Sequence, residues 1–145
     1  MSAALALALA AAYLGLFGFK LLGTGLALRA RPARAEPPAP AAVSVLTPIL
    51  GGDPELPVVL DDHVRALEGM CFLWLVDADD PVGRGAAEAV RAAHPGRPIE
   101  ILVCPPAPPG VNPKTFKLDL ALARVGTPIF LVLDDDARLP TASLA

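Results

Sequence analysis

The sequence predicts an α/β protein with a mostly parallel sheet, preceded by one N-terminal membrane-spanning helix. The first observation is an alternation of short apolar runs with segments that begin with helix caps. This order is typical of a parallel sheet whose crossovers are helices. The second observation is a long apolar stretch at the start of the chain. With 145 residues, the chain has the length of one domain of ordinary size.

Residues 3–28 are almost wholly apolar and are long enough to cross a bilayer, which requires about 20 apolar residues. Lys20 lies inside this stretch, so its ammonium group must reach the interface or face a partner helix. Arg29, Arg31 and Arg34 follow the stretch, and no basic residue precedes it. The positive-inside tendency therefore predicts a single-pass membrane protein whose remaining part is cytoplasmic.

A secreted protein with a cleaved signal peptide is the alternative interpretation of the same stretch. Residues 33–35, Ala-Arg-Ala, resemble a small-residue cleavage site. Two features favour the membrane anchor instead. The stretch lacks a basic start, and it exceeds the usual signal-peptide apolar core of about 7–15 residues.

The chain beyond the apolar stretch is rich in proline at first and acidic thereafter. Residues 29–42 are Pro/Ala-rich and predict an extended linker. From Pro37 onward there are eight Lys/Arg and fourteen Asp/Glu, a formal charge of −6, which argues against nucleic acid as a partner. Cys71 and Cys104 lack metal-type spacing and are expected to be reduced, partly buried thiols.

Four short apolar runs are the predicted strands, and they cover residues 43–46, 71–76, 99–103 and 129–133. Their uninterrupted apolar character suits strands that are buried on both faces. Three helices are predicted between them, at residues 53–67, 84–93 and 112–125. The first and third begin with a cap signature, Asp53-Pro54 and Asn112-Pro113, in which a capping side chain precedes a proline. Gly126 is placed to stop the third helix.

Acidic residues follow two of these strands. Asp77, Asp79 and Asp80 come after the second, and residues 134–136 are three consecutive aspartates after the fourth. The carboxyl ends of parallel strands share one edge of the sheet, where ligands bind in this architecture. Clustered carboxylates are costly without a compensating cation, and oxygen ligands suit Mg²⁺ or Mn²⁺. An Asp-x-Asp here predicts a diphosphate–metal site, with a solvated acidic turn as the alternative.

Several stretches together resemble the lipid-directed glycosyltransferases of family 2, and most closely the ceramide glucosyltransferase branch, family 21. The resemblance rests on VSVLTPILGGDPEL (43–56), VDADDP (76–81), AHPGRPIEILV (93–103), GVNPKTFKL (110–118) and FLVLDDDARLP (130–140). It covers residues 43–145, and the N-terminal anchor also fits the family. It implies a partial, Rossmann-like GT-A sheet with helices on both faces. It further implies a nucleotide-sugar donor, most simply a UDP-sugar, together with Mg²⁺ or Mn²⁺, a lipid acceptor and an inverting transfer.

The resemblance assigns donor binding to Thr47, Pro48, Asp80, Lys114 and Asp134, and metal binding to Asp134 and Asp136. Asp80 is expected near the nucleoside, although an aspartate at this position also suits a loop cap. Lys114 is expected beside the anionic donor, where an ammonium group adds a charge-assisted contact. Thr47 and Pro48 are expected to flank the base through backbone groups. Asp135 is expected to point away from its two neighbours, because side chains alternate along an extended segment.

Two parts of the family pattern have no counterpart in this sequence. The third aspartate, which is the general base in the family, and the Gln/Arg-x-x-Arg-Trp motif near the acceptor are both missing, and the one tryptophan, Trp74, belongs to a predicted strand. We therefore expect residues 43–145 to be a truncated donor-binding half with no catalytic base, an exposed apolar sheet edge and no turnover by itself.

Two other interpretations of the sequence remain open. One is an inactive membrane-tethered fragment of such an enzyme. The other is a phosphohydrolase with Asp134 as nucleophile. Arg138 stands where that class has Thr or Val, and the motif follows the fourth strand rather than the first. His63 and His94 are expected to be structural or on the surface, because no Cys or His pairs with them at metal-ligand spacing.

Overall fold

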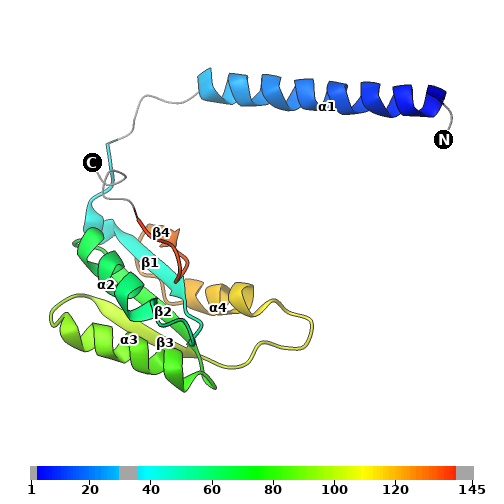
Figure 1. The fold of residues 1–145 in the computed structure, drawn as a ribbon. Helices are drawn as coiled ribbons and strands as arrows, with labels where there is room; N and C mark the ends of the chain where they lie inside the picture. The colour runs from blue at the N-terminus through cyan, green and yellow to red at the C-terminus, as the bar shows by residue number, and fades with distance from the viewer. Residues whose placement is uncertain (1–2, 30–35, 140–145) are drawn as a thin grey trace. The chain divides into compact units, whose positions relative to one another are not determined.

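A computed structural model describes residues 3–29 and 36–139 of the chain. The chain divides into two units, Met1–Pro37 and Pro38–Ala145. Each unit is described by itself (Figure 1).

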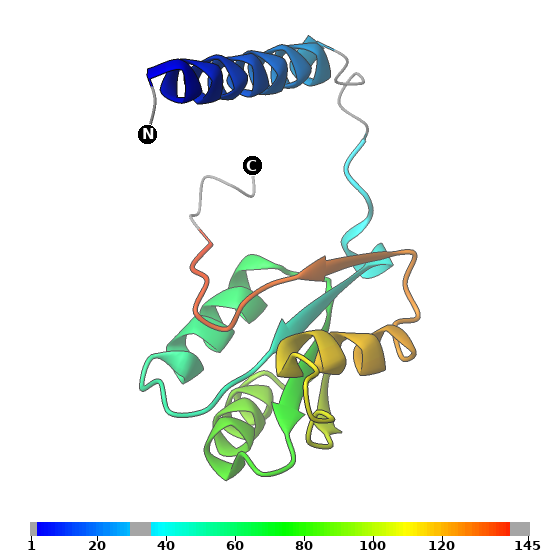
Figure 2. The ribbon, with the colours of Figure 1, turned by 90° about the vertical axis from the view of Figure 1, so that its right-hand side faces the viewer.

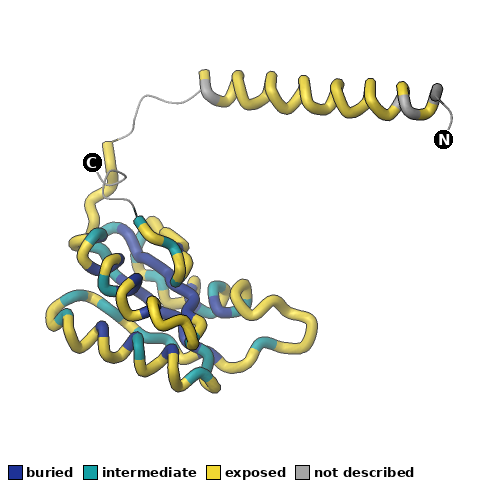
Figure 3. Tube along the Cα trace, in the orientation of Figure 1, coloured by how far each residue is buried: buried dark blue, intermediate teal, exposed yellow. Residues whose placement is uncertain are grey.

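The N-terminal unit is one apolar helix, α1 (Ala3–Arg29), of 27 residues. Within it, Leu9–Ala27 is long and apolar enough to cross a membrane. Its described side chains are exposed all round, so no apolar stripe is covered by protein (Figure 3). The predicted helix is therefore observed, and its length and composition suit a membrane anchor. A signal sequence would have the same form, so the anchor stays a prediction.

The C-terminal unit is built on a four-stranded parallel sheet. Its strands are β1 (Val43–Pro48), β2 (Cys71–Asp77), β3 (Ile99–Cys104) and β4 (Ile129–Val132). The order across the sheet is β3-β2-β1-β4, so β1 lies between β2 and β4. All six residues of β1 are buried. The four predicted strands are thus confirmed, and the central one is the first in sequence.

Three helices cover the sheet on both faces, as predicted. They are α2 (Leu56–Ala66), α3 (Pro81–Ala93) and α4 (Pro113–Leu122). Helices α2 and α3 pack together on one face, and α4 packs on the other (Figures 1 and 2). Neighbouring residues of β1 serve opposite layers. Val45 joins the core under α2 and α3, and Leu46 joins the core under α4, as the two-residue period of a strand requires.

The helix boundaries differ from the sequence predictions at three places. Asp53 does not cap α2, because the N-cap is Glu55 and the Asp53 carboxylate accepts a hydrogen bond from the Glu55 amide at 2.8 Å. Helix α3 begins at Pro81, three residues earlier than predicted, because Asp80 caps it. Helix α4 ends at Leu122, before the predicted residue 125. The Asn112 cap of α4 is confirmed by its bond from the Thr115 amide at 3.1 Å.

Two further segments bear on the sequence predictions. The predicted linker ends in a 3₁₀ turn, η1 (Pro40–Ala42), directly before β1. Strand β4 hydrogen-bonds only to β1 within the described part of the chain, and all four of its apolar side chains are 39–50% exposed. The expected apolar edge is therefore observed at β4. An edge of this kind offers unpaired backbone groups for association.

Asp61 on α2 makes the stability of the C-terminal unit depend on pH. His94 Nε2 lies 2.6 Å from Asp61 Oδ1. This hydrogen bond is the main cause that lowers the pKa of Asp61, with Arg65 adding to it and burial opposing it. A carboxyl group with a lowered pKa stabilises the fold above its unfolded pKa of about 3.9. That stabilisation is lost as the pH falls through the folded pKa.

We predict that wild type melts at a higher temperature than D61N near pH 6, and that the difference becomes smaller as the pH falls below about 3.9. Circular dichroism melts across this range measure it. E88Q is the control, because Glu88 forms an exposed pair with Arg84 on α3. A difference between wild type and D61N that does not change with pH would contradict the prediction.

Candidate functional site

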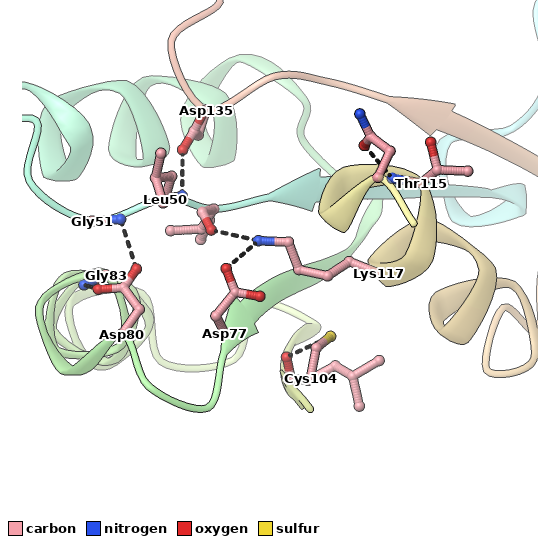
Figure 4. A network of polar contacts seen from close by, with 12 residues as sticks. Leu50, Gly51, Asp77, Asp80, Gly83, Cys104, Thr115, Lys117 and Asp135 are labelled. Atoms are coloured by element: carbon pink, nitrogen blue, oxygen red, sulfur yellow. Dashed lines mark hydrogen bonds and ion pairs between the residues drawn. The ribbon is translucent and has the colours of Figure 1, made fainter. Parts of the chain in front are cut away.

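The loop after β1 is the meeting point of the two acidic clusters. Strands β2 and β4 flank β1, so the residues that follow them approach this loop from opposite sides. Asp80 Oδ2 accepts a hydrogen bond from the Gly51 amide at 2.6 Å, and Asp135 Oδ2 accepts one from the Leu50 amide at 2.7 Å (Figure 4). The predicted proximity of the clusters at the carboxyl edge of the sheet is therefore confirmed.

Asp80 joins the start of α3 to the loop after β1. Its second oxygen, Oδ1, accepts from the Gly83 amide at 2.8 Å while Oδ2 is bound to Gly51. Both glycines are needed for this approach, because a Cβ at either position would lie 2.3 Å from an Asp80 carboxylate oxygen. The loop-cap interpretation of Asp80 is thus observed. A contact with a nucleoside stays a prediction and would have to use the remaining lone pairs of the carboxylate.

Lys117 is the principal residue that the sequence analysis missed. Its side chain is only 6% exposed, and Nζ lies 2.9 Å from Asp77 Oδ2 and 3.0 Å from the Ile49 carbonyl oxygen (Figure 4). A buried charge is costly unless it is paired and hydrogen-bonded, and both conditions hold here. The available signal was its spacing of three residues from Lys114, which places both ammonium groups on one side of α4.

The Cys104 thiol lies in the same charged surroundings but is not a nucleophile. It is fully buried at the end of β3. Burial raises its pKa, and the nearby Lys117 ammonium only partly offsets this effect. Because a thiol with a raised pKa stays protonated near neutral pH, it is inert. The expectation of partly buried thiols is met, with Cys71 half-buried and Cys104 buried.

A cavity of about 330 Å³ opens beyond the ends of β1 and β4. It is lined by Pro48, Ile49, Leu50, Lys114, Lys117, Asp134, Asp135 and Asp136. Four residues predicted to bind donor or metal are therefore brought together, and they are Pro48, Lys114, Asp134 and Asp136. Thr47 and Asp80 are absent from the lining. Thr47 is fully buried, and its hydroxyl oxygen has no partner among the described residues.

The prediction that Asp135 points away from its neighbours is wrong. Asp135 lines the same cavity as Asp134 and Asp136 and holds the Leu50 amide. The reason is that the backbone turns here, since the Ala137 amide donates to the Asp134 carbonyl oxygen at 3.1 Å. Side chains alternate only along an extended segment, and this one is not extended.

The open end of the cavity carries an exposed ion pair. Lys114 Nζ lies 2.5 Å from Asp134 Oδ1, and both side chains are 49% exposed. Exposed pairs contribute only about 0–1 kcal/mol, so a ligand can separate them at little cost. Asp136 has no hydrogen bond or ion pair within residues 3–29 and 36–139, so its carboxylate is available to a ligand.

The carboxylates suit a metal ion that arrives with its ligand. Within the described ranges, no group of three or more His, Cys, Asp or Glu side chains could hold a metal by itself. Mg²⁺ commonly binds through only one or two carboxylates and completes its shell with water and substrate phosphates. Asp134 and Asp136 fit that arrangement, so the donor set matches a diphosphate-bound divalent ion.

Fold and cavity together define the class of protein. It is a Rossmann-like α/β protein with a charged cavity beyond the carboxyl ends of its parallel strands, where ligands bind in this architecture. The chain matches the family model described as Glycosyl transferase family 21 over residues 3–145, and it belongs to this family. The match includes α1. No curated protein and no solved structure gave a significant match to the chain.

We predict that K117M lowers the free energy of unfolding by about 3 kcal/mol, because it leaves a buried carboxylate and carbonyl without their cation. This figure is at the low end for buried pairs, because the Asp77 side chain is 22% exposed and water can reach part of it. Urea unfolding of the full chain in detergent measures it. K114M is the matched control and should cost less than about 1 kcal/mol, because its pair is exposed. Equal losses in the two variants would contradict a special role for Lys117.

Proposed function

We propose that the C-terminal unit binds the nucleotide-sugar donor of a glycosyltransferase in the cavity beyond β1 and β4. Family membership supports glycosyl transfer and implies a nucleotide-sugar donor and an acceptor. The observation that carries the proposal is the convergence of Pro48, Lys114, Asp134 and Asp136 on one cavity. These residues come from β1, α4 and the segment after β4, and the sheet order together with the packing of α4 on the sheet brings them together.

The exposed end of the cavity is proposed to take the diphosphate. Asp134 and Asp136 would hold Mg²⁺ or Mn²⁺, which neutralises the charge of the diphosphate leaving group. Lys114 pairs with Asp134 in this structure, and its ammonium group would instead bind a phosphate oxygen when the donor binds. The three charged side chains at this end, Lys114, Asp134 and Asp136, would therefore each face an opposite charge in the bound state.

The inner end of the cavity is proposed to take the nucleoside, most simply uridine. Pro48 lines the cavity directly. The resemblance implies that the backbone of Thr47 and the Asp80 carboxylate would lie near the base. Asp80 fixes Gly51, which directly follows the cavity-lining Leu50 in the loop after β1. The phosphohydrolase alternative, with Asp134 as nucleophile, is not favoured, because the chain belongs to a glycosyltransferase family.

The acceptor is proposed to be a membrane lipid, with inversion at the anomeric carbon. The support is the exposed apolar helix α1 and the resemblance to the ceramide glucosyltransferase branch. We propose that α1 spans the membrane once and that the C-terminal unit is cytoplasmic, with no role for nucleic acid. No described residue is assigned as the general base, so the proposal for this chain concerns donor binding.

We predict that the full chain in detergent binds UDP only when Mg²⁺ or Mn²⁺ is present, because Asp134 and Asp136 require a cation beside a diphosphate. Titration calorimetry with and without chelator measures this. D136N should weaken metal-dependent binding at least tenfold, in the range known for disturbed metal sites. D119N is the matched control, because Asp119 is exposed on α4 and does not line the cavity. Equal binding with and without chelator would overturn the site.

We predict that a reporter fused after Ala145 lies in the cytoplasm. A reporter that works only in the cytoplasm should therefore be active, and one that works only outside should be inactive. Arg29, Arg31 and Arg34 supply the positive flank that sets this orientation. Replacing all three with Ala and placing Arg before residue 3 should shift fusions toward the outside. A fusion that is secreted and shortened near residues 33–35 would establish the signal-peptide alternative instead.

A further inference from the structure

His63 is a buried polar residue that the proposed donor site does not use. It lies on α2 and is only 1% exposed. Its Nε2 lies 2.6 Å from the Ala137 carbonyl oxygen, 74 residues away in sequence. Because a carbonyl oxygen only accepts, Nε2 carries the hydrogen of this bond. The other ring nitrogen, Nδ1, is buried and has no partner within the described residues.

The bond from His63 holds one end of a short turn that carries the site's carboxylates. We define residues 134–137 as the carboxylate turn, which is closed by the bond from the Ala137 amide to the Asp134 carbonyl oxygen. Just before it, the Leu133 amide donates to the Leu46 carbonyl oxygen at 3.0 Å and fixes the exit from β4. Just after it, Leu139 packs against the core under α2.

Three elements contact the carboxylate turn through hydrogen bonds or ion pairs. Among these contacts, only the one from His63 has a buried donor residue. Lys114 of α4 pairs with Asp134, and the Leu50 amide binds Asp135, and both of these contacts are exposed. His63 of α2 supplies the third contact from inside the core. The outer pairs of Arg138 with Glu55 and Asp62 lie on the same side as His63 but are more than half exposed.

The buried bond from His63 to the Ala137 carbonyl should persist when a ligand binds, unlike the exposed contacts of the turn. A diphosphate and its metal would compete directly for Lys114 and Asp134, and water competes at every exposed pair. The His63 bond has no such competitor, and breaking it would leave a buried nitrogen without its acceptor. It therefore keeps the turn in place while the exposed charges exchange partners.

We propose that His63 is a positioning residue for the proposed donor site. By holding the Ala137 carbonyl, it sets where Asp134 and Asp136 stand relative to Lys114, although it touches neither metal nor diphosphate. The expected effect of His63 on ligand binding rests on the proposed function. The placement of the turn by His63 stands on the contacts alone and is tested separately.

The experiment compares H63Q with H63F in the full chain in detergent. Gln places an N–H donor near the position of His Nε2, whereas Phe fills the space without a donor. The probe is Mn²⁺ with UDP, with free Mn²⁺ followed by electron paramagnetic resonance. We expect H63F to bind Mn²⁺ with UDP roughly tenfold more weakly, the low end of effects from disturbing groups that orient metal ligands, and H63Q to stay near wild type. H94F is the matched control, because His94 binds Asp61 rather than the turn.

Amide hydrogen exchange provides the second measurement and does not depend on any ligand. In H63F, exchange should accelerate at the Leu50 and Ala137 amides, which are bonded to the turn, and not at Leu73 in the core. H63Q should resemble wild type. This pattern separates positioning from a general loss of stability, which would accelerate exchange in the core as well.

The outcomes distinguish the two proposals. If wild type does not bind Mn²⁺ with UDP but exchange at the turn depends on the residue 63 donor, the placement stands and the proposed function fails. If wild type binds and H63F binds equally well, the positioning role of His63 fails while the proposed function stands. Equal weakening in H63Q and H63F would also overturn it, because packing rather than the donor would then be responsible.

Discussion

The Lys117 ammonium group lies 3.0 Å from the Ile49 carbonyl oxygen and 2.9 Å from the Asp77 carboxylate, almost fully shielded from water. It connects α4 with the loop after β1 and with the end of β2, which lie 68 and 40 residues away from it in the sequence. Residues of α4 and of the loop after β1 line the cavity, and Asp77 at the end of β2 supports them through Lys117. A buried cation tolerates little displacement, because its partners have no water to replace it. This contact is therefore one of the buried constraints on the position of the loop after β1.

That loop in turn receives the other contacts of the site. The Gly51 amide is held by Asp80 from one side, and the Leu50 amide is held by Asp135 from the other. The result is a cavity with unequal ends. Its inner end has charges that are buried and already satisfied, and its outer end has an exposed ion pair and the Asp136 carboxylate, which has no partner among the described residues. A rigid inner wall with exchangeable outer charges suits a ligand that is neutral at one end and anionic at the other, such as a nucleoside diphosphate.

Much of the fold follows from local patterns in the sequence. The alternation of apolar runs and capped segments predicted four strands and three helices in the right order, and the Asn112 cap was correct. Asp-rich segments after the second and fourth strands predicted a charged edge. Such features are decided by neighbours a few residues apart, because helix and strand periods and caps act over that distance. Asp53 shows the limit even there, since its carboxylate bonds the Glu55 amide and the helix begins two residues later than a cap at Asp53 would place it.

The sequence by itself determined the element types, the apolar helix α1 and the set of charged residues at one edge of the sheet. Only the tertiary structure decided which of those residues share a cavity. The order β3-β2-β1-β4 places the loop after β1 between the two acidic clusters. In the folded unit Lys117 becomes a buried link, Asp135 binds the Leu50 amide and His63 reaches Ala137. These contacts join residues 68, 85 and 74 positions apart, respectively, and at such separations no local periodicity relates one partner to the other.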